Sequence, residues 1–174
     1  MGTMTLGRFL PTKPHGWESI GRARGVSVVA VCNSNQLGTT ASFTRKCADA
    51  GCVALLATNA SPAMACWGGR AKVLGTNPWS IAAPAASRGA VVTDLANTAV
   101  ARGKFYAPAE RNENTPPSWA ADEHGVATTD RHSAIKQLVL PTAGHKRYVI
   151  SFMMNVLARV LIGSQFGTGV AGEL

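Results

Sequence analysis

The chain has 174 residues, of which 46% are hydrophobic and 15% are charged, a composition that excludes a disordered protein and fits one globular domain. Its 17 Lys and Arg residues outnumber its 9 Asp and Glu residues, which gives a net charge of +8. The basic residues are scattered, however, and the sequence has neither an RNP-like nor a zinc-finger pattern. Nucleic-acid binding is therefore not predicted.

The sequence also carries no sign of export or of membrane insertion. Residues 1–16 lack the charged start, the apolar stretch and the cleavage site of a signal peptide. The apolar stretch from Tyr148 to Ile162 is interrupted by Asn155 and Arg159 and is shorter than the roughly 20 residues of a membrane span. We therefore expect a cytoplasmic protein without a membrane partner. Its cysteines form no C-x-x-C pair, so we expect no metal site, only free buried thiols in a reducing compartment, at Cys32, Cys47, Cys52 and Cys66.

The first half of the chain alternates between helical and strand-like patterns. Trp17–Arg24 has a helical composition and is followed by Gly25, a residue suited to the left-handed position after a helix. Val26–Val31 is continuous and β-branched, which predicts a strand covered on both faces. A short helix over Ser42–Gly51 and a second buried strand over Cys52–Asn59 follow. The order strand, loop, helix, strand places a polar loop where ligands commonly bind.

The second half begins with short pieces separated by Pro and Gly. Short strands and tight turns are expected over residues 61–85, and Ala90–Leu95 predicts a further strand. Ala107–Thr129 is polar and contains two adjacent prolines, which indicates a surface excursion. The stretch "GHKRYVISFMMNVLARVLIG" (residues 144–163) then predicts a long, apolar, buried helix that ends at Gly163.

The loop "VCNSNQLGTT" (residues 31–40) is rich in hydroxyl and amide side chains but matches neither a G-x-G-x-x-G nor a Walker pattern. Backbone N–H groups around Gly38, with the hydroxyls of Thr39 and Thr40 at a helix start, could hold an anion. Simple capping of the helix by one of the two threonines explains the same residues. The sequence leaves both interpretations open.

Three other features admit a structural and a functional interpretation. The turn "GTNP" (residues 75–78) is rich in turn-forming residues, but a turn can also present a binding group. Asp94, near the end of a strand, could accept a bond from a ribose hydroxyl or cap the next segment. His145 and Lys146 open the most apolar helix and could bind a phosphate or lie at a hydrated helix end. The sequence has no Ser-His-Asp arrangement, no paired carboxylates and no cluster of metal ligands.

Five segments in unbroken order, from about Trp17 to Gly167, resemble the type 2 malate/L-lactate dehydrogenase family. The resemblance implies an NAD- or NADP-dependent oxidoreductase that interconverts small 2-hydroxy acids and 2-oxo acids. It also implies an α/β fold with a large, mainly antiparallel sheet flanked by helices, which is not a Rossmann fold, and a homodimer. The segments are "NSNQLGTT", "TNASPAMACWGGRAKVLGTNPWSIAAPA", "VVTDLANTAVARGK", "PPSWAADEHGVATTD" and "LPTAGHKRYVISFMMNVLARVLIGSQFG".

Site residues follow from the resemblance position by position. Thr76 is similar to a family residue that contacts substrate. The positions that match cofactor contacts are Gln36, Leu37, Gly38, Thr39, Thr40, Asp94, Leu95, Ala96, His145 and Lys146. Family members usually read S-N-H-F-G where this chain has Gln36 and Leu37 at the third and fourth positions. An uncharged amide and an aliphatic side chain thus replace a histidine and an aromatic ring.

The match is also partial in length. The family's proton-donating histidine and substrate-binding arginine belong to an N-terminal region that has no counterpart here, so the catalytic residues are unknown. The interpretation is a cofactor-binding core over residues 17–167, truncated at both ends, with an unmatched segment 1–16 and a tail 168–174. A truncated or frame-shifted gene would explain residues 1–16. Lys104 stands where the family's imine reductases have an aspartate, which favours the 2-hydroxy acid branch. The alternative is an inactive remnant that retains at most cofactor binding or dimerisation.

Overall fold

The computed structural model describes residues 23–31, 37–105, 113–130 and 138–160, and they belong to two compact units. The first unit runs to Leu56 and also includes Trp79–Asp94. The second unit comprises Ala57–Pro78 and the chain from Leu95 onward. The chain therefore crosses between the two units at the ends of strands.

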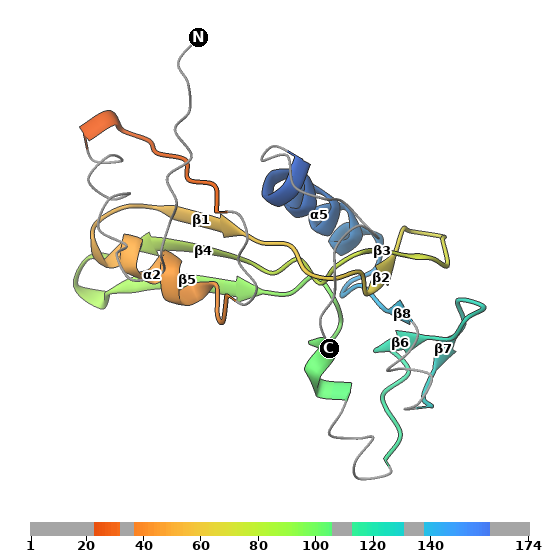
Figure 1. The fold of residues 1–174 in the computed structure, drawn as a ribbon. Helices are drawn as coiled ribbons and strands as arrows, with labels where there is room; N and C mark the ends of the chain where they lie inside the picture. The colour runs from red at the N-terminus through yellow and green to blue at the C-terminus, as the bar shows by residue number, and fades with distance from the viewer. Residues whose placement is uncertain (1–22, 32–36, 106–112, 131–137, 161–174) are drawn as a thin grey trace. The chain divides into compact units, whose positions relative to one another are not determined.

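The first unit is built on helix α2 and a three-stranded sheet in the order β1-β4-β5. Neighbouring strand arrows point in opposite directions, so the sheet is antiparallel (Figure 1). A short 3-10 turn, η2, closes the β4–β5 hairpin. The bounds are α2 Ala41–Asp49, β1 Ala54–Ala57, β4 Trp79–Pro84, η2 Ala86–Arg88 and β5 Ala90–Leu95. The helix predicted over Ser42–Gly51 and the strand predicted over Ala90–Leu95 are confirmed.

Helix α2 covers one face of this sheet (Figure 1). Thr44 of the helix and Ser80 of β4 share a buried hydrogen bond of 2.6 Å between their hydroxyl oxygens. On the alternate positions the side chains of Leu55, Ile81 and Val91 are 56%, 38% and 65% exposed. The prediction that the strand around β1 is buried on both faces is therefore wrong for this chain. Side chains alternate along a strand, and the helix covers only one of the two sets.

The predicted strand Val26–Val31 is also not formed. The segment has no strand assignment, and Val26 and Val28 are 72% and 83% exposed. Branched side chains favour extended backbone, but a strand also needs a neighbour to accept its hydrogen bonds, and no strand of the described ranges pairs with this segment. Gly25, with φ of +83°, does take the left-handed conformation predicted for the end of the preceding helix.

The second unit contains two small antiparallel sheets. Strands β2 and β3 pair with Met64 opposite Leu74, and β6 lies between β7 and β8. These strands confirm the short strands expected after residue 61 and the mixed, antiparallel character of the fold. In the described residues the strands form three small sheets, not one large sheet. The bounds are β2 Met64–Ala65, β3 Lys72–Leu74, β6 Ala120–Ala121, β7 Ala127–Thr128 and β8 Leu138–Val139.

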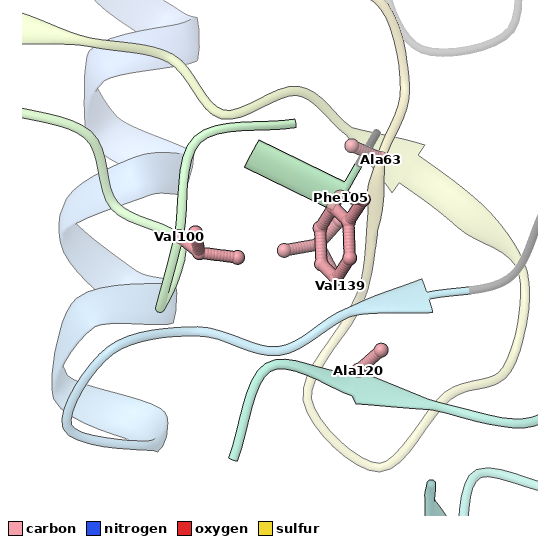
Figure 2. Close-up of a cluster of buried hydrophobic side chains, with 5 residues drawn as sticks. All are labelled: Ala63, Val100, Phe105, Ala120 and Val139. Atoms are coloured by element: carbon pink, nitrogen blue, oxygen red, sulfur yellow. The ribbon is translucent and has the colours of Figure 1, made fainter. Parts of the chain in front are cut away.

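A compact hydrophobic cluster lies between these strands (Figure 2). Its largest member is Phe105, the last residue of the 3-10 turn η3 (Arg102–Phe105), which is 1% exposed and meets the ring of Trp119 edge-on with centroids 5.7 Å apart. The other members are Ala63, Val100, Ala120 and Val139. The interpretation of residues 107–129 as a surface excursion is wrong for Ala120 and its neighbours in β6. Two alanines carry little hydropathy signal, but their small side chains allow close packing.

Helix α5 (His145–Asn155) continues as a π-helical segment, η4 (Val156–Val160), within the range of the predicted long helix. The expectation that its apolar surface is buried is wrong. Ser151, Asn155 and Arg159 are buried, while apolar residues on the other side are 39–53% exposed, namely Val149, Phe152, Met153 and Leu157. None of the helices in the described segments is long and apolar enough to cross a membrane. The predicted helix end at Gly163 and most of the predicted helix Trp17–Arg24 lie outside the described residues.

Candidate functional site

The start of helix α2 is joined to the end of strand β5 by a carboxylate. Thr40 is 1% exposed, and its hydroxyl donates a hydrogen bond of 2.6 Å to Asp94 Oδ1. The backbone N–H of Ala41, the first residue of the helix, donates to Asp94 Oδ2 at 2.7 Å. Asp94 is 54 residues from Thr40 in the sequence, so this connection is tertiary. It places two of the predicted cofactor residues in direct contact.

The bonds of Asp94 affect both interpretations of the loop at residues 31–40, helix capping by a threonine and anion binding. Neither threonine side chain caps the helix, since Thr40 directs its hydroxyl to Asp94 and the side chain of Asp94 accepts from the first helical N–H instead. A phosphate at the same N–H would meet a carboxylate already there. An ionised carboxylate has about four acceptor positions, so Asp94, which is exposed, retains acceptors for the hydroxyl groups of a sugar.

The remaining residues of this loop are more open. Gly38 and Thr39 are exposed and Leu37 is half-buried. Gly38 has φ of +74°, a conformation that glycine adopts without strain, and a side chain there would meet no atom within 4 Å. The glycine thus serves the backbone turn and not close packing. Gln36 lies outside the described residues.

In the second unit, Thr76 is held in a turn that its neighbours constrain tightly. A Cβ on Gly75 would lie 2.2 Å from the carbonyl oxygen of Ala60, so only glycine fits there. Asn77 is fully buried with φ of +39°, a left-handed conformation that asparagine tolerates better than most residues. Thr76, between them, is half-buried, and its carbonyl accepts from the N–H of Asn97 at 3.1 Å. The turn "GTNP" is thus a rigid element that fixes the position of Thr76.

Leu95 and Ala96, also predicted to contact the cofactor, lead directly from β5 to Asn97. Both are half-buried, and Asn97 is 0% exposed. The side-chain nitrogen of Asn97 donates to the carbonyl oxygen of Asn77 at 2.7 Å, and its own carbonyl accepts from the N–H of Thr142 at 3.0 Å. The segment after β5 is therefore bonded both to the Thr76 turn and to the turn that precedes α5.

His145 and Lys146 form the exposed beginning of helix α5. Gly144 precedes them with φ of +62°, and a Cβ there would lie 3.3 Å from the Trp67 ring. Trp67 also meets the His145 imidazole edge-on, with centroids 5.7 Å apart. With Arg147, three basic side chains occupy the first turn, which contains no acidic residue. Cationic side chains are unfavourable at this positive end of the helix dipole. An anion bound there is stabilised both by the dipole and by the basic side chains.

Two further side chains lie close to this helix start. A hydrogen bond with the Cys66 sulfur raises the pKa of the Tyr148 phenol, and burial and the electrostatic interaction with Cys66 raise it further. The described cysteines are free, as expected, but they are not buried: Cys66 is exposed, and Cys47 and Cys52 are half-buried. Cys32 lies outside the described residues. No group of three or more potential metal ligands occurs in the part of the chain that the structure describes.

Sequence reasoning missed a set of buried polar residues in the second unit. Arg159 is 3% exposed, and loss of hydration lowers the pKa of its guanidinium. With its amide oxygen turned toward that guanidinium, Asn59 accepts hydrogen bonds from it. One signal was readable, because Ser151, Asn155 and Arg159 follow one another every fourth residue and so share one helix face. The positions of Asn77 and Asn97 gave no comparable signal.

The fold belongs to a class shared with known dehydrogenases. A crystal structure of a dehydrogenase from Sinorhizobium meliloti matches this chain with a TM-score of 0.83 and 32% sequence identity. The match covers 90% of this chain and 46% of that chain. The described units therefore correspond to part of a larger dehydrogenase fold.

The sequence profile of the malate/L-lactate dehydrogenase family matches residues 19–174, and the chain belongs to that family. It is 40% identical over 151 residues to L-sulfolactate dehydrogenase of Methanothermobacter thermautotrophicus, covering 87% of this chain and 44% of that protein. It is 35% identical to (2R)-3-sulfolactate dehydrogenase (NADP(+)) of Chromohalobacter salexigens, covering 85% of this chain and 44% of that protein. It is also 35% identical to ureidoglycolate dehydrogenase (NAD(+)) of Escherichia coli K12, covering 84% of this chain and 42% of that protein. The chain thus spans less than half the length of these relatives.

Proposed function

We propose that the chain is the dinucleotide-binding part of an NAD- or NADP-dependent oxidoreductase of 2-hydroxy acids. The observation that carries the proposal is the basic first turn of helix α5. Side chains of His145, Lys146 and Arg147 at the positive end of a helix dipole are explained by an anionic ligand, and the phosphates of a dinucleotide supply the required charge. The names of the relatives, which include NAD(+) and NADP(+) enzymes, support the same ligand class.

The two sets of candidate residues have different chemistry, which fits the parts of a dinucleotide. Lys146 provides a charge-assisted hydrogen bond to phosphate oxygen. Asp94 provides acceptors for ribose hydroxyls, and the exposed backbone of Gly38 and Thr39 provides further polar contacts. The other proposed cofactor contacts are Gln36, Leu37, Thr40, Leu95, Ala96 and His145. When bound, the dinucleotide donates or accepts the hydride.

Thr76 is the proposed substrate contact. Its hydroxyl is presented by a turn that Gly75 and Asn77 hold rigidly, and a fixed hydroxyl can bond a carboxylate or a carbonyl oxygen. The substrates in the relatives' names, sulfolactate and ureidoglycolate, are hydroxy acids. Catalytic residues are not assigned.

Finer features of the proposal follow from the family. We propose the non-Rossmann fold of the type 2 malate/L-lactate dehydrogenases, with a cofactor-binding core over residues 17–167 and the segments 1–16 and 168–174 outside it. A homodimer in the cytoplasm completes the proposal. The alternative is an inactive remnant that binds cofactor without turnover.

Fluorescence titration of the full chain with NADH and NADPH tests the proposal. Saturable binding is expected, and Lys146→Gln weakens it about tenfold, the loss of a charge-assisted bond. Lys46→Gln, which removes an exposed lysine from the last turn of α2, is the matched control and leaves the affinity unchanged. Equal effects of the two variants, or no saturable binding, refute the site. Assays with malate, sulfolactate and ureidoglycolate then separate enzyme from remnant, because a remnant binds without turnover.

A further inference from the structure

A pair of buried asparagines connects the parts of the second unit that carry candidate ligand contacts. Asn97 is fully buried, and its backbone N–H donates to the carbonyl of Thr76 at 3.1 Å. Its side-chain nitrogen donates to the carbonyl of Asn77 at 2.7 Å and lies 3.5 Å from the Thr76 carbonyl. Its own carbonyl accepts from Thr142 N at 3.0 Å. Asn97 thus holds two other segments through both its main chain and its side chain.

Asn77 extends the connection to helix α5. Its carboxamide oxygen accepts from the N–H of Ala60 at 3.2 Å. Its side-chain nitrogen donates to the carbonyl oxygen of Ser151 at 3.2 Å and to its hydroxyl at 3.3 Å. The left-handed backbone of Asn77, with φ of +39°, is maintained by these bonds on both sides of the residue. The turn that presents Thr76 is therefore attached to the helix that begins with His145 and Lys146.

We propose that Asn97 is a positioning residue that holds Thr76, the Leu95–Ala96 segment and the helix start at His145–Lys146 in one fixed arrangement. The inference rests on the proposed function, since it assigns ligand contacts to these three segments. Ala96 immediately precedes Asn97 in the chain, and the carbonyl of Thr76 accepts a hydrogen bond from Asn97. Thr142, which donates to Asn97, lies three residues before His145. One buried residue therefore fixes substrate and cofactor contacts relative to each other, through its main chain and its side chain.

The side-chain amide is the part of Asn97 that a substitution can test. Its main-chain bonds to Thr76 and Thr142 survive a change of side chain, but the bond to the buried carbonyl of Asn77 does not. Asn97→Leu keeps a similar volume and removes the donor. Thr115→Val is the matched control, because Thr115 is 2% exposed in the same unit and its hydroxyl donates to the Thr129 carbonyl at 3.2 Å, outside the three segments.

NADH affinity and amide hydrogen exchange of the full chain test the positioning role of Asn97. Both are measured at a temperature where circular dichroism shows that every variant is folded. We expect Asn97→Leu to weaken NADH binding about fivefold or more, within the usual range of coupling between sites. We also expect faster amide hydrogen exchange at residues 75–77, 95–98 and 142–146. Thr115→Val changes neither quantity. If Asn97→Leu does not fold, Asn97→Ser, which retains a shorter donor, replaces it.

Faster exchange in Asn97→Leu with an unchanged NADH affinity overturns the positioning role, because the network then serves only stability. Equal weakening of NADH binding by Thr115→Val overturns it as well. A wild-type chain that binds no dinucleotide refutes the proposed function, and the positioning role with it. The two failures are distinguished by the wild-type titration alone.

Discussion

Replacement of Asp94 by asparagine tests the connection between strand β5 and helix α2. In the wild type, one carboxylate accepts from the buried Thr40 hydroxyl at 2.6 Å and from the Ala41 N–H at 2.7 Å. Asparagine has a single acceptor oxygen, so one of these donors loses its partner. The negative charge that complements the positive end of the helix dipole is lost as well.

The expected loss of unfolding free energy in Asp94→Asn depends on how exposed each bonded group is. A hydrogen bond to a charged group contributes about 1.5–3 kcal/mol, and loss of an N-terminal cap costs about 0.5–2 kcal/mol. Asp94 is exposed, so water and salt screen the charge and can satisfy part of the freed donors. We therefore expect Asp94→Asn to lower the free energy of unfolding by about 2 kcal/mol, which is about 4–8 °C in Tm for a chain of this length.

Thermal unfolding followed by circular dichroism measures the effect, and Asp49→Asn provides the control. Asp49 is an exposed acid at the last residue of the same helix, where a negative charge is unfavourable, so its removal leaves Tm unchanged or raises it slightly. Added salt should reduce the difference between the two variants. Equal changes in Tm for Asp94→Asn and Asp49→Asn would refute the role assigned to the carboxylate.

Further predictions concern the second unit. Phe105→Ala opens a cavity in the hydrophobic cluster and should lower the free energy of unfolding by about 3–5 kcal/mol, measured by urea denaturation; a loss below about 1 kcal/mol would contradict the packing shown in Figure 2. Gly75→Ala should cost about 3 kcal/mol because its Cβ would lie 2.2 Å from a backbone oxygen, whereas Gly68→Ala, in open space, should cost only the strain of a positive φ, about 1–2 kcal/mol; equal losses would show that the close approach is absent. Cys66→Ala should lower the pKa of Tyr148 toward 10.0, measured as the phenolate absorbance that Tyr148→Phe removes; an unchanged titration would exclude the hydrogen bond.

Local patterns predicted those elements whose partners are also present. Helix α2 (Ala41–Asp49) overlaps the predicted range Ser42–Gly51, and β5 matches the predicted strand, because Gly51 follows the helix, Gly89 precedes the strand and each element packs in the first unit. Val26–Val31 has the same local preference for extended backbone but no partner strand in the described residues. A strand forms only when a second segment pairs with it through hydrogen bonds, and the sequence of the first segment does not show whether that partner exists.

Helix α5 shows a second limit of sequence reasoning. Its apolar composition suggested burial, yet its buried face carries Ser151, Asn155 and Arg159. Hydropathy assigns the apolar face to the interior, but buried hydrogen bonds with residues such as Asn77 reverse that orientation. The polar partner of such a residue comes from a distant part of the chain, so neither local preference nor periodicity predicts it.

The candidate site was partly readable from the sequence. The polar loop, Asp94 and the His145–Lys146 pair were singled out by the family resemblance, whereas their positions beside predicted elements left a structural and a functional interpretation open. The bond between Thr40 and Asp94 was not, since the two are 54 positions apart. The structure therefore contributes the contacts, and with them the finding that the start of α2 already carries a carboxylate.

Amide hydrogen exchange of the full chain with and without NADH tests the central claim most directly. If the assigned loops form the dinucleotide site, bound NADH slows exchange at residues 37–41, 94–96 and 144–147, and NADPH or NAD(+) reproduces the pattern in the same segments. Slower exchange confined to other segments, or no change at concentrations of NADH that saturate its fluorescence, would contradict the account.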